Sequence, residues 1–95
     1  MKLQLGCCVG LKNIVMSAHA SRRAKERGIS EEWIKAVINE PQETIDVKFG
    51  RKASFKKFGD YYIVVIYEDH KDEIVVVTVV RADKKRLKRY GFSRI

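Results

Sequence analysis

The spacing of hydrophobic residues along the chain changes near Pro41, from a helical period to a strand period. Before this proline, apolar residues recur every three or four positions, whereas after it they alternate or run together. Ser17 is a suitable N-cap and Gly28 a suitable left-handed C-cap, so the pattern predicts a helix over residues 17–28. Ser30 is the expected cap of a second helix, which the proline ends.

The two predicted helices have different faces. The first has a side of small residues, which lets a helix lie close to its neighbour: Ser17, Ala20, Ser21, Ala24 and Gly28. The second has an apolar stripe, formed by Trp33, Ile34, Val37 and Ile38. Both faces are suited to packing against a sheet.

Four strands are predicted in the C-terminal half of the chain. Their ranges are 44–49, 52–58, 61–67 and 74–80. In the first of these, Ile45, Val47 and Phe49 share one face. Gly59 and Asp60 predict a tight hairpin turn between the second and third strands. The last two strands are nearly continuous apolar runs, which is typical of strands buried on both faces.

Short connections between these strands favour an antiparallel meander. Residues 1–16 are either an N-terminal extension or an edge strand, and the pattern leaves both open. We therefore expect one domain over residues 1–95, with an α+β fold in which two N-terminal helices pack on one face of a four- or five-stranded antiparallel sheet. The expected core spans residues 17–81, and a basic C-terminal tail spans residues 82–95.

Charge adds a second feature, because it is concentrated in that tail. The chain has 20 Lys and Arg residues against 12 Asp and Glu residues, a net charge of +8 at pH 7. Seven basic residues against Asp83 give the segment from Arg81 onward six of these eight charges: Arg81, Lys84, Lys85, Arg86, Lys88, Arg89 and Arg94. A local basic segment points to an anionic partner, with nucleic acid first and an acidic protein or membrane surface second.

Several classes of site have no motif in this sequence. Cys7 and Cys8 are neighbours that cannot form an ordinary structural disulfide, so a disulfide-stapled secreted scaffold is excluded and a cytoplasmic location is expected. The chain has no P-loop, dinucleotide glycine motif, GxSxG motif or paired-histidine metal spacing. No apolar run approaches the roughly 20 residues of a membrane span. We therefore expect no metal, no cofactor and no membrane partner.

His19 is the side chain best suited to proton transfer near neutral pH. Arg23 and Arg27 follow it at successive steps of four, so the three residues share one helical face. Arginines at such a place can stabilise a phosphate. A solvated charged face is the competing interpretation, because Arg22 and Glu26 also lie one turn apart.

Three further residues could carry chemistry. Thr78 interrupts a run of valines, and a buried hydroxyl there needs a partner, although threonine is also an ordinary strand former. Tyr90, in the basic tail, is suited to stacking on a base, to acting as an acid or to anchoring the tail on the sheet. His70 lies among charged turn residues and is expected at the surface.

Several of these segments together resemble a known family. They are His19 with Arg22 or Arg23, the stretch Arg27-Gly28-Ile29-Ser30, the second helix ending at Pro41, the stretch Tyr62-Ile63-Val64-Val65 and the stretch Val76-Val77-Thr78-Val79. Over about residues 17–81 the chain resembles domain-of-unknown-function family 4258. That family is grouped with the RelE-like toxins of the barnase–EndoU–colicin–RelE superfamily.

The resemblance implies a small metal-independent endoribonuclease, often the toxin of a toxin–antitoxin pair. His19 would transfer a proton at the ribose 2′-hydroxyl or the leaving 5′-oxygen. Arg23 and Arg27 would bind the scissile phosphate, and Thr78 would position the RNA. Beside the resemblance, the local basic charge leads us to expect that RNA, free or on the ribosome, is bound by Arg22, Arg81, Lys84, Lys85, Arg86, Lys88, Arg89 and Tyr90. An acidic antitoxin would neutralise the toxin. The alternative is a non-catalytic module that binds RNA or a partner protein.

Overall fold

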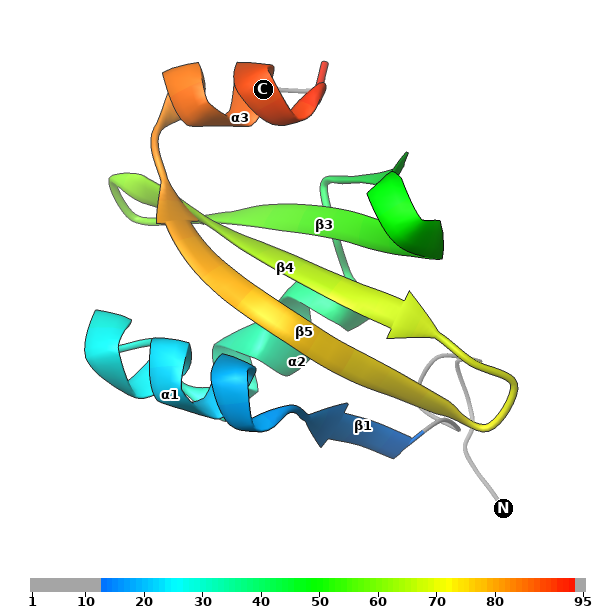
Figure 1. Cartoon of the computed structure of the whole chain (residues 1–95). Helices are drawn as coiled ribbons and strands as arrows, with labels where there is room; N and C mark the ends of the chain where they lie inside the picture. The colour runs from blue at the N-terminus through cyan, green and yellow to red at the C-terminus, as the bar shows by residue number, and fades with distance from the viewer. Residues whose placement is uncertain (1–12, 94–95) are drawn as a thin grey trace.

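The computed structural model describes residues 13–93, which form a five-stranded sheet with helices on both of its faces (Figure 1). The strands are β1 (Asn13–Met16), β2 (Glu43–Val47), β3 (Arg51–Phe58), β4 (Tyr61–Asp69) and β5 (Glu73–Ala82). The helices are α1 (Ala18–Arg27), α2 (Glu31–Asn39), the short 3-10 helix η2 (Lys48–Gly50) and α3 (Lys84–Tyr90). In the sheet, the strand order is β1-β5-β4-β3-β2.

Capping residues define both ends of α1 and the start of α2. The Ser17 side chain accepts a hydrogen bond of 3.0 Å from the backbone N–H of Ala20. Gly28 follows α1 with a φ of 65°, a left-handed conformation that glycine adopts without strain. The Ser30 side chain accepts a bond of 3.3 Å from the backbone N–H of Trp33. Both helices therefore start at the serine that the sequence indicates.

The sheet is mixed, so the prediction of two N-terminal helices on a purely antiparallel sheet is wrong. β1 precedes both helices and pairs in parallel with β5, with Met16 opposite Val76. The neighbouring pairs among β2 to β5 are antiparallel. Short turns impose that direction on consecutive strands, but the neighbour of β1 is distant in sequence, so no turn constrains the direction of β1.

The direction of β1 follows instead from the start of α1. The backbone N–H of Ser17, directly after β1, donates to the carbonyl of Val76 at 3.1 Å, and its hydroxyl donates to the carbonyl of Val77 at 3.2 Å. α1 then continues along β5 in the direction that β1 began (Figure 1). The edge of β5 is thus covered first by a strand and then by a helix.

The sheet separates two hydrophobic clusters. The first joins α1 and α2 to the sheet and contains Ala20, Val37 and Val65, each with no measurable exposure. The second lies on the opposite face and contains Phe55 together with Leu87 of α3. Figure 1 shows α3 on the far side of the sheet from α1 and α2. The segment predicted as a basic tail therefore forms a helix that covers part of the second face.

A β-bulge divides β5. Ile66 of β4 pairs with Thr78, but the next residue, Tyr67, pairs with Val76, so Val77 is an extra residue. The bulge shifts the alternation of side chains by one position. Thr78 and the residues after it therefore alternate out of step with the residues before it.

Candidate functional site

The predicted catalytic face of α1 consists of three residues with different surroundings. His19 is exposed, and within residues 13–93 it makes no hydrogen bond or ion pair. Arg23 lies one turn further along and donates to the Glu26 carboxylate at 3.1 Å, a surface pair on the same helix. Arg27, after one more turn, is half-buried and reaches the sheet. The charged-face interpretation therefore describes Arg23 well.

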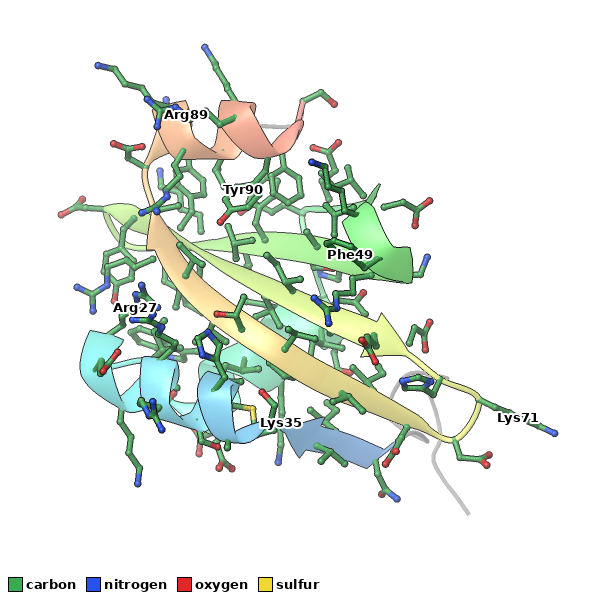
Figure 2. The ribbon with its side chains drawn as sticks, viewed as in Figure 1. Arg27, Lys35, Phe49, Lys71, Arg89 and Tyr90 are labelled. Atoms are coloured by element: carbon green, nitrogen blue, oxygen red, sulfur yellow. The ribbon has the colours of Figure 1, made fainter. Side chains whose placement is uncertain are left out.

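Arg27 and Arg81 tie the end of α1 to the end of β5. The Arg27 guanidinium donates to the backbone carbonyl of Val79 at 3.1 Å. The Arg81 guanidinium donates in turn to the backbone carbonyl of Arg27, and it lies 4.5 Å from the centroid of the Tyr61 ring. Figure 2 shows Arg27 at the C-terminal end of α1, beside β5. Both guanidinium groups therefore have partners within the protein.

Thr78 lies on the other face of the sheet from the packed side of α1. It stands opposite Ile66, and the side chain two residues on, Val80, belongs to the second hydrophobic cluster. Ala20 and Ala24 of α1 belong to the first cluster. The structure thus brings Arg27 together with Arg81, and it places Thr78 on a different face.

The basic segment is a capped and anchored helix. The Asp83 side chain accepts a hydrogen bond of 2.9 Å from the backbone N–H of Arg86. Leu87 is fully buried, and the Phe92 ring meets the Phe55 ring edge-on at a centroid distance of 4.6 Å. Five exposed cations cover the outer surface of α3: Lys84, Lys85, Arg86, Lys88 and Arg89. None of them forms an ion pair with another residue that the structure describes.

Two other residues predicted to bind RNA differ in exposure. Tyr90 is half-buried, packs against the second cluster, and has its ring 6.2 Å from that of Phe92. Arg22 is exposed on α1. Tyr90 therefore helps to anchor α3, which is the packing role that the sequence allowed, while Arg22 points to solvent.

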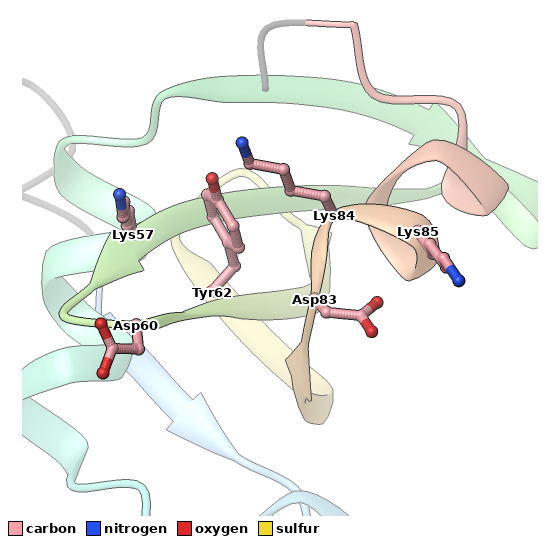
Figure 3. Close-up of a pocket in the computed structure, with 6 residues that line it drawn as sticks. All are labelled: Lys57, Asp60, Tyr62, Asp83, Lys84 and Lys85. Atoms are coloured by element: carbon pink, nitrogen blue, oxygen red, sulfur yellow. The ribbon is translucent and has the colours of Figure 1, made fainter.

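A hollow of about 460 Å³ lies where the start of α3 meets the β3–β4 hairpin (Figure 3). Its lining residues are Lys57, Asp60, Tyr62, Asp83, Lys84 and Lys85. Figure 3 shows the Tyr62 hydroxyl between the side chains of Lys57 and Lys84, with the carboxylates of Asp60 and Asp83 pointing elsewhere. Tyr62 is 6% exposed, yet its hydroxyl makes no hydrogen bond to another residue in the described part of the chain.

From the sequence, Lys57 was not proposed as a site residue and Tyr62 was quoted only as part of a family stretch, although the hairpin indicates that the two residues lie opposite each other. A tight turn at Gly59 and Asp60 sets the register on either side of it, and this register places Lys57 opposite Tyr62. Tyrosine in a buried strand also brings a hydroxyl that needs a partner. A basic residue opposite such a tyrosine was therefore available from the sequence as a site candidate.

Phe49 also departs from the sequence prediction. β2 ends at Val47, two residues earlier than expected, and Phe49 lies in η2 with a φ of 66°. This conformation is unusual for a residue other than glycine, and the side chain is 84% exposed. The guanidinium of Arg51 lies 5.8 Å from the centroid of its ring. An exposed aromatic ring with an arginine beside it can stack on a nucleic-acid base.

Glu68, on β4, is an acidic residue whose pKa is shifted by its neighbours. The Glu68 carboxylate accepts a hydrogen bond of 3.1 Å from the Arg51 guanidinium and another of 3.1 Å from the His70 ring. These bonds, the one from Arg51 first in importance, hold the pKa of Glu68 below its ordinary value. His70 is exposed near the β4–β5 turn, as expected. This group of charges is therefore internally paired.

In residues 13–93, no three side chains among His, Cys, Asp and Glu gather where they could hold a metal ion. No helix in this range is long and apolar enough to cross a membrane. Cys7 and Cys8 lie outside the described residues.

Comparison with known proteins gives one match. A family model described as a domain of unknown function, DUF4258, matches residues 16–81. No curated protein and no solved structure matches the chain. The matched region is more than half of the 95 residues, and it runs from the end of β1 almost to the end of β5, with α3 following it. The chain therefore belongs to the DUF4258 family, a domain family of unknown function.

Proposed function

We propose that this protein binds single-stranded RNA through the outer surface of α3. The observation that carries the proposal is the set of five exposed cations on α3, none of them in an ion pair with another described residue. Such a surface attracts backbone phosphates and releases their condensed counterions on binding. Because the buried Leu87 fixes the helix on the sheet, the backbone that carries these cations has a defined position.

The exposed ring of Phe49 supports a single strand as the partner. Val47, two residues before it, packs against the second hydrophobic cluster, to which Leu87 also belongs. The strand that leads into η2 therefore ends beside the cluster that α3 covers. Unpaired bases stack on exposed aromatic rings, whereas the bases of a duplex are already stacked on one another.

The test is fluorescence anisotropy with a labelled single-stranded oligoribonucleotide at several salt concentrations. One variant carries Lys88→Gln and Arg89→Gln on α3. The matched control carries Lys35→Gln and Lys71→Gln, which remove two exposed charges from α2 and from the β4–β5 turn, away from α3 in Figure 2. Each phosphate contact with a single strand adds about 0.7 to the salt slope, or about fivefold in affinity at 0.1 M salt.

We expect the α3 variant to bind about 25-fold more weakly at 0.1 M salt, with a slope flatter by about 1.4, if both side chains contact phosphates. The control should stay within about twofold of the wild type, because distant charges are screened. Equal losses in the two variants would mean that net charge alone attracts the RNA. Unmeasurable binding by the wild type would reject the proposal and leave an acidic protein as the partner to seek.

A metal-independent endoribonuclease of the RelE-like toxin group is the second proposal. The observation that favours it is the exposed His19, which has no hydrogen-bond partner in residues 13–93 and lies one turn from Arg23. His19 would move the proton of the ribose 2′-hydroxyl or protonate the leaving 5′-oxygen, giving a 2′,3′-cyclic phosphate. In a toxin, an acidic antitoxin would cover the basic surface of α3.

Cleavage of labelled RNA in the presence of EDTA tests this second proposal. His19→Ala should slow cleavage by about 100- to 10,000-fold, the usual contribution of a positioned proton-transfer group. His70→Ala is the matched control and should cleave like the wild type. Equal cleavage by both variants would remove His19 from the mechanism, and binding without cleavage by the wild type would leave the non-catalytic function.

A further inference from the structure

We propose that the hollow between the start of α3 and the β3–β4 hairpin binds a phosphate group. In the cell this would be one backbone phosphate of the bound strand, so the inference rests on the proposed RNA binding and names a point of contact within it. Three donors converge there from two parts of the fold: Lys57 and Tyr62 from the hairpin, and Lys84 from α3.

The Tyr62 hydroxyl is the observation that points to a ligand. Tyr62 and Tyr67 are both 6% exposed on β4, but their hydroxyls differ. The Tyr67 hydroxyl forms a hydrogen bond of 3.2 Å with the buried Ser54, on the sheet face of the first cluster. The Tyr62 hydroxyl has no protein partner among residues 13–93 and lies in the hollow between Lys57 and Lys84. A buried tyrosine usually has a partner for its hydroxyl, and a bound acceptor would supply one.

The charges around this hydroxyl favour an anion. The lysines that line the hollow are Lys57, Lys84 and Lys85, against the two carboxylates of Asp60 and Asp83. The Asp83 carboxylate already accepts a hydrogen bond from the backbone of Arg86, and neither carboxylate points toward the Tyr62 hydroxyl in Figure 3. Lys85 also points away in Figure 3, so Lys57 and Lys84 are the charged residues that flank the hydroxyl.

Phosphate matches these donors better than a planar acid does. An ammonium group can only donate hydrogen bonds, and a tyrosine hydroxyl can donate one. The oxygens of a phosphate are arranged tetrahedrally, so they can meet donors that arrive from several directions. Lys57 and Tyr62 are directly opposite each other in the β3–β4 register, so the hairpin holds these two donors together without a ligand.

RNA binding by three variants measures the contribution of the hollow. Lys57→Gln removes a charge from the hollow, and Lys71→Gln removes one from the distant β4–β5 turn as its matched control. We expect the first to weaken binding about fivefold at 0.1 M salt, with a slope flatter by about 0.7, and the second to change affinity by less than twofold. Tyr62→Phe removes only the hydroxyl, so it should weaken binding about three- to tenfold with an unchanged salt slope.

A titration of the wild type and of Tyr62→Phe with inorganic phosphate, followed by NMR, tests the hollow without RNA. We expect saturable shifts of the backbone amides of Lys57, Tyr62 and Lys84, with weaker saturation in the variant. If the wild type binds RNA but Lys57→Gln matches Lys71→Gln and Tyr62→Phe matches the wild type, the site is rejected while RNA binding by α3 stands. If the wild type binds no RNA, the proposed function fails; localised phosphate shifts would then support the site, and their absence would reject it.

Discussion

α1 and α3 are both basic helices, yet their cations have different surroundings. On α1, Arg22 and Lys25 are exposed, but Arg23 is paired with Glu26 and Arg27 donates to the backbone of β5. On α3, the five cations from Lys84 to Arg89 are exposed and form no ion pair with another described residue. Two basic helices therefore differ in how many of their basic residues have partners within the protein.

The difference follows from what each helix covers. α1 packs Ala20 and Ala24 into the first cluster, but it also lies along an edge of β5, where backbone carbonyls need donors. Ser17 and Arg27 supply these donors to Val77 and Val79. α3 lies on a face of the sheet, where apolar side chains need to be covered, and Leu87 does this. A helix on a sheet face uses its apolar side for packing and leaves its polar side to solvent.

Among the tests of this comparison, Leu87→Ala is expected to change the free energy of unfolding most. The side chain is fully buried, so its truncation should lower the free energy of unfolding by about 2–5 kcal/mol. Lys88→Ala, at the adjacent exposed position, should change it by less than about 0.5 kcal/mol. Denaturant unfolding measures both values. A loss below about 1 kcal/mol for Leu87→Ala would show that α3 is not part of the folded core.

Arg27→Gln is expected to have a smaller effect that sharpens the comparison. It removes the hydrogen bond to the Val79 carbonyl, so the free energy of unfolding should fall by about 1 kcal/mol. Arg23→Gln removes a surface pair and should cost about 0.3–0.5 kcal/mol. Thermal unfolding of both proteins tests the order. Equal stabilities of the two variants would mean that the hydrogen bond from Arg27 to the Val79 carbonyl does not stabilise the fold. Arg27 would then resemble the exposed cations of α3.

The smallest expected change in stability comes from the pair of Arg51 and Glu68 in the sheet. Because the pKa of Glu68 is lowered in the folded protein, its carboxylate stabilises the fold above its unfolded pKa, and this stabilisation is lost as the pH falls through the folded pKa. The melting temperature of the wild type should therefore fall more steeply between about pH 5 and pH 3 than that of Glu68→Gln. Arg51→Gln should flatten the same region, and an unchanged profile in both variants would contradict the pairing.

Local signals in the sequence predict much of this fold. Ser17, Gly28 and Ser30 mark helix ends because their side chains or conformations act within one turn. Gly59 and Asp60 mark the β3–β4 turn for the same reason. The direction of β1 has no such signal, because its partner lies some sixty residues away in sequence. The bulge at Val77 has none either, because valines lie on both sides of Val77 and Thr78, and an apolar run that continues on both faces hides a change of face.

The candidate site was predictable only in part. The basic segment is visible as charge, but its helix depends on buried apolar contacts, above all that of Leu87, which charge counting overlooks. The spacing of His19, Arg23 and Arg27 describes one side of a helix correctly, but it cannot show that Arg27 turns to a carbonyl of another element. The sequence cannot show that the Tyr62 hydroxyl is unpaired within the described residues, because this depends on which residues lie around it in three dimensions.

The way α1 covers β5 has a consequence for how separate molecules meet. An open strand edge is a template on which the strand of another copy can pair, which is a common start of aggregation. On β5, pairing with β1 ends at Val76, and the next two carbonyls that α1 engages are occupied by Ser17 and Arg27. An arginine whose spacing suggests chemistry on RNA thus also helps to keep copies of this protein from joining edge to edge.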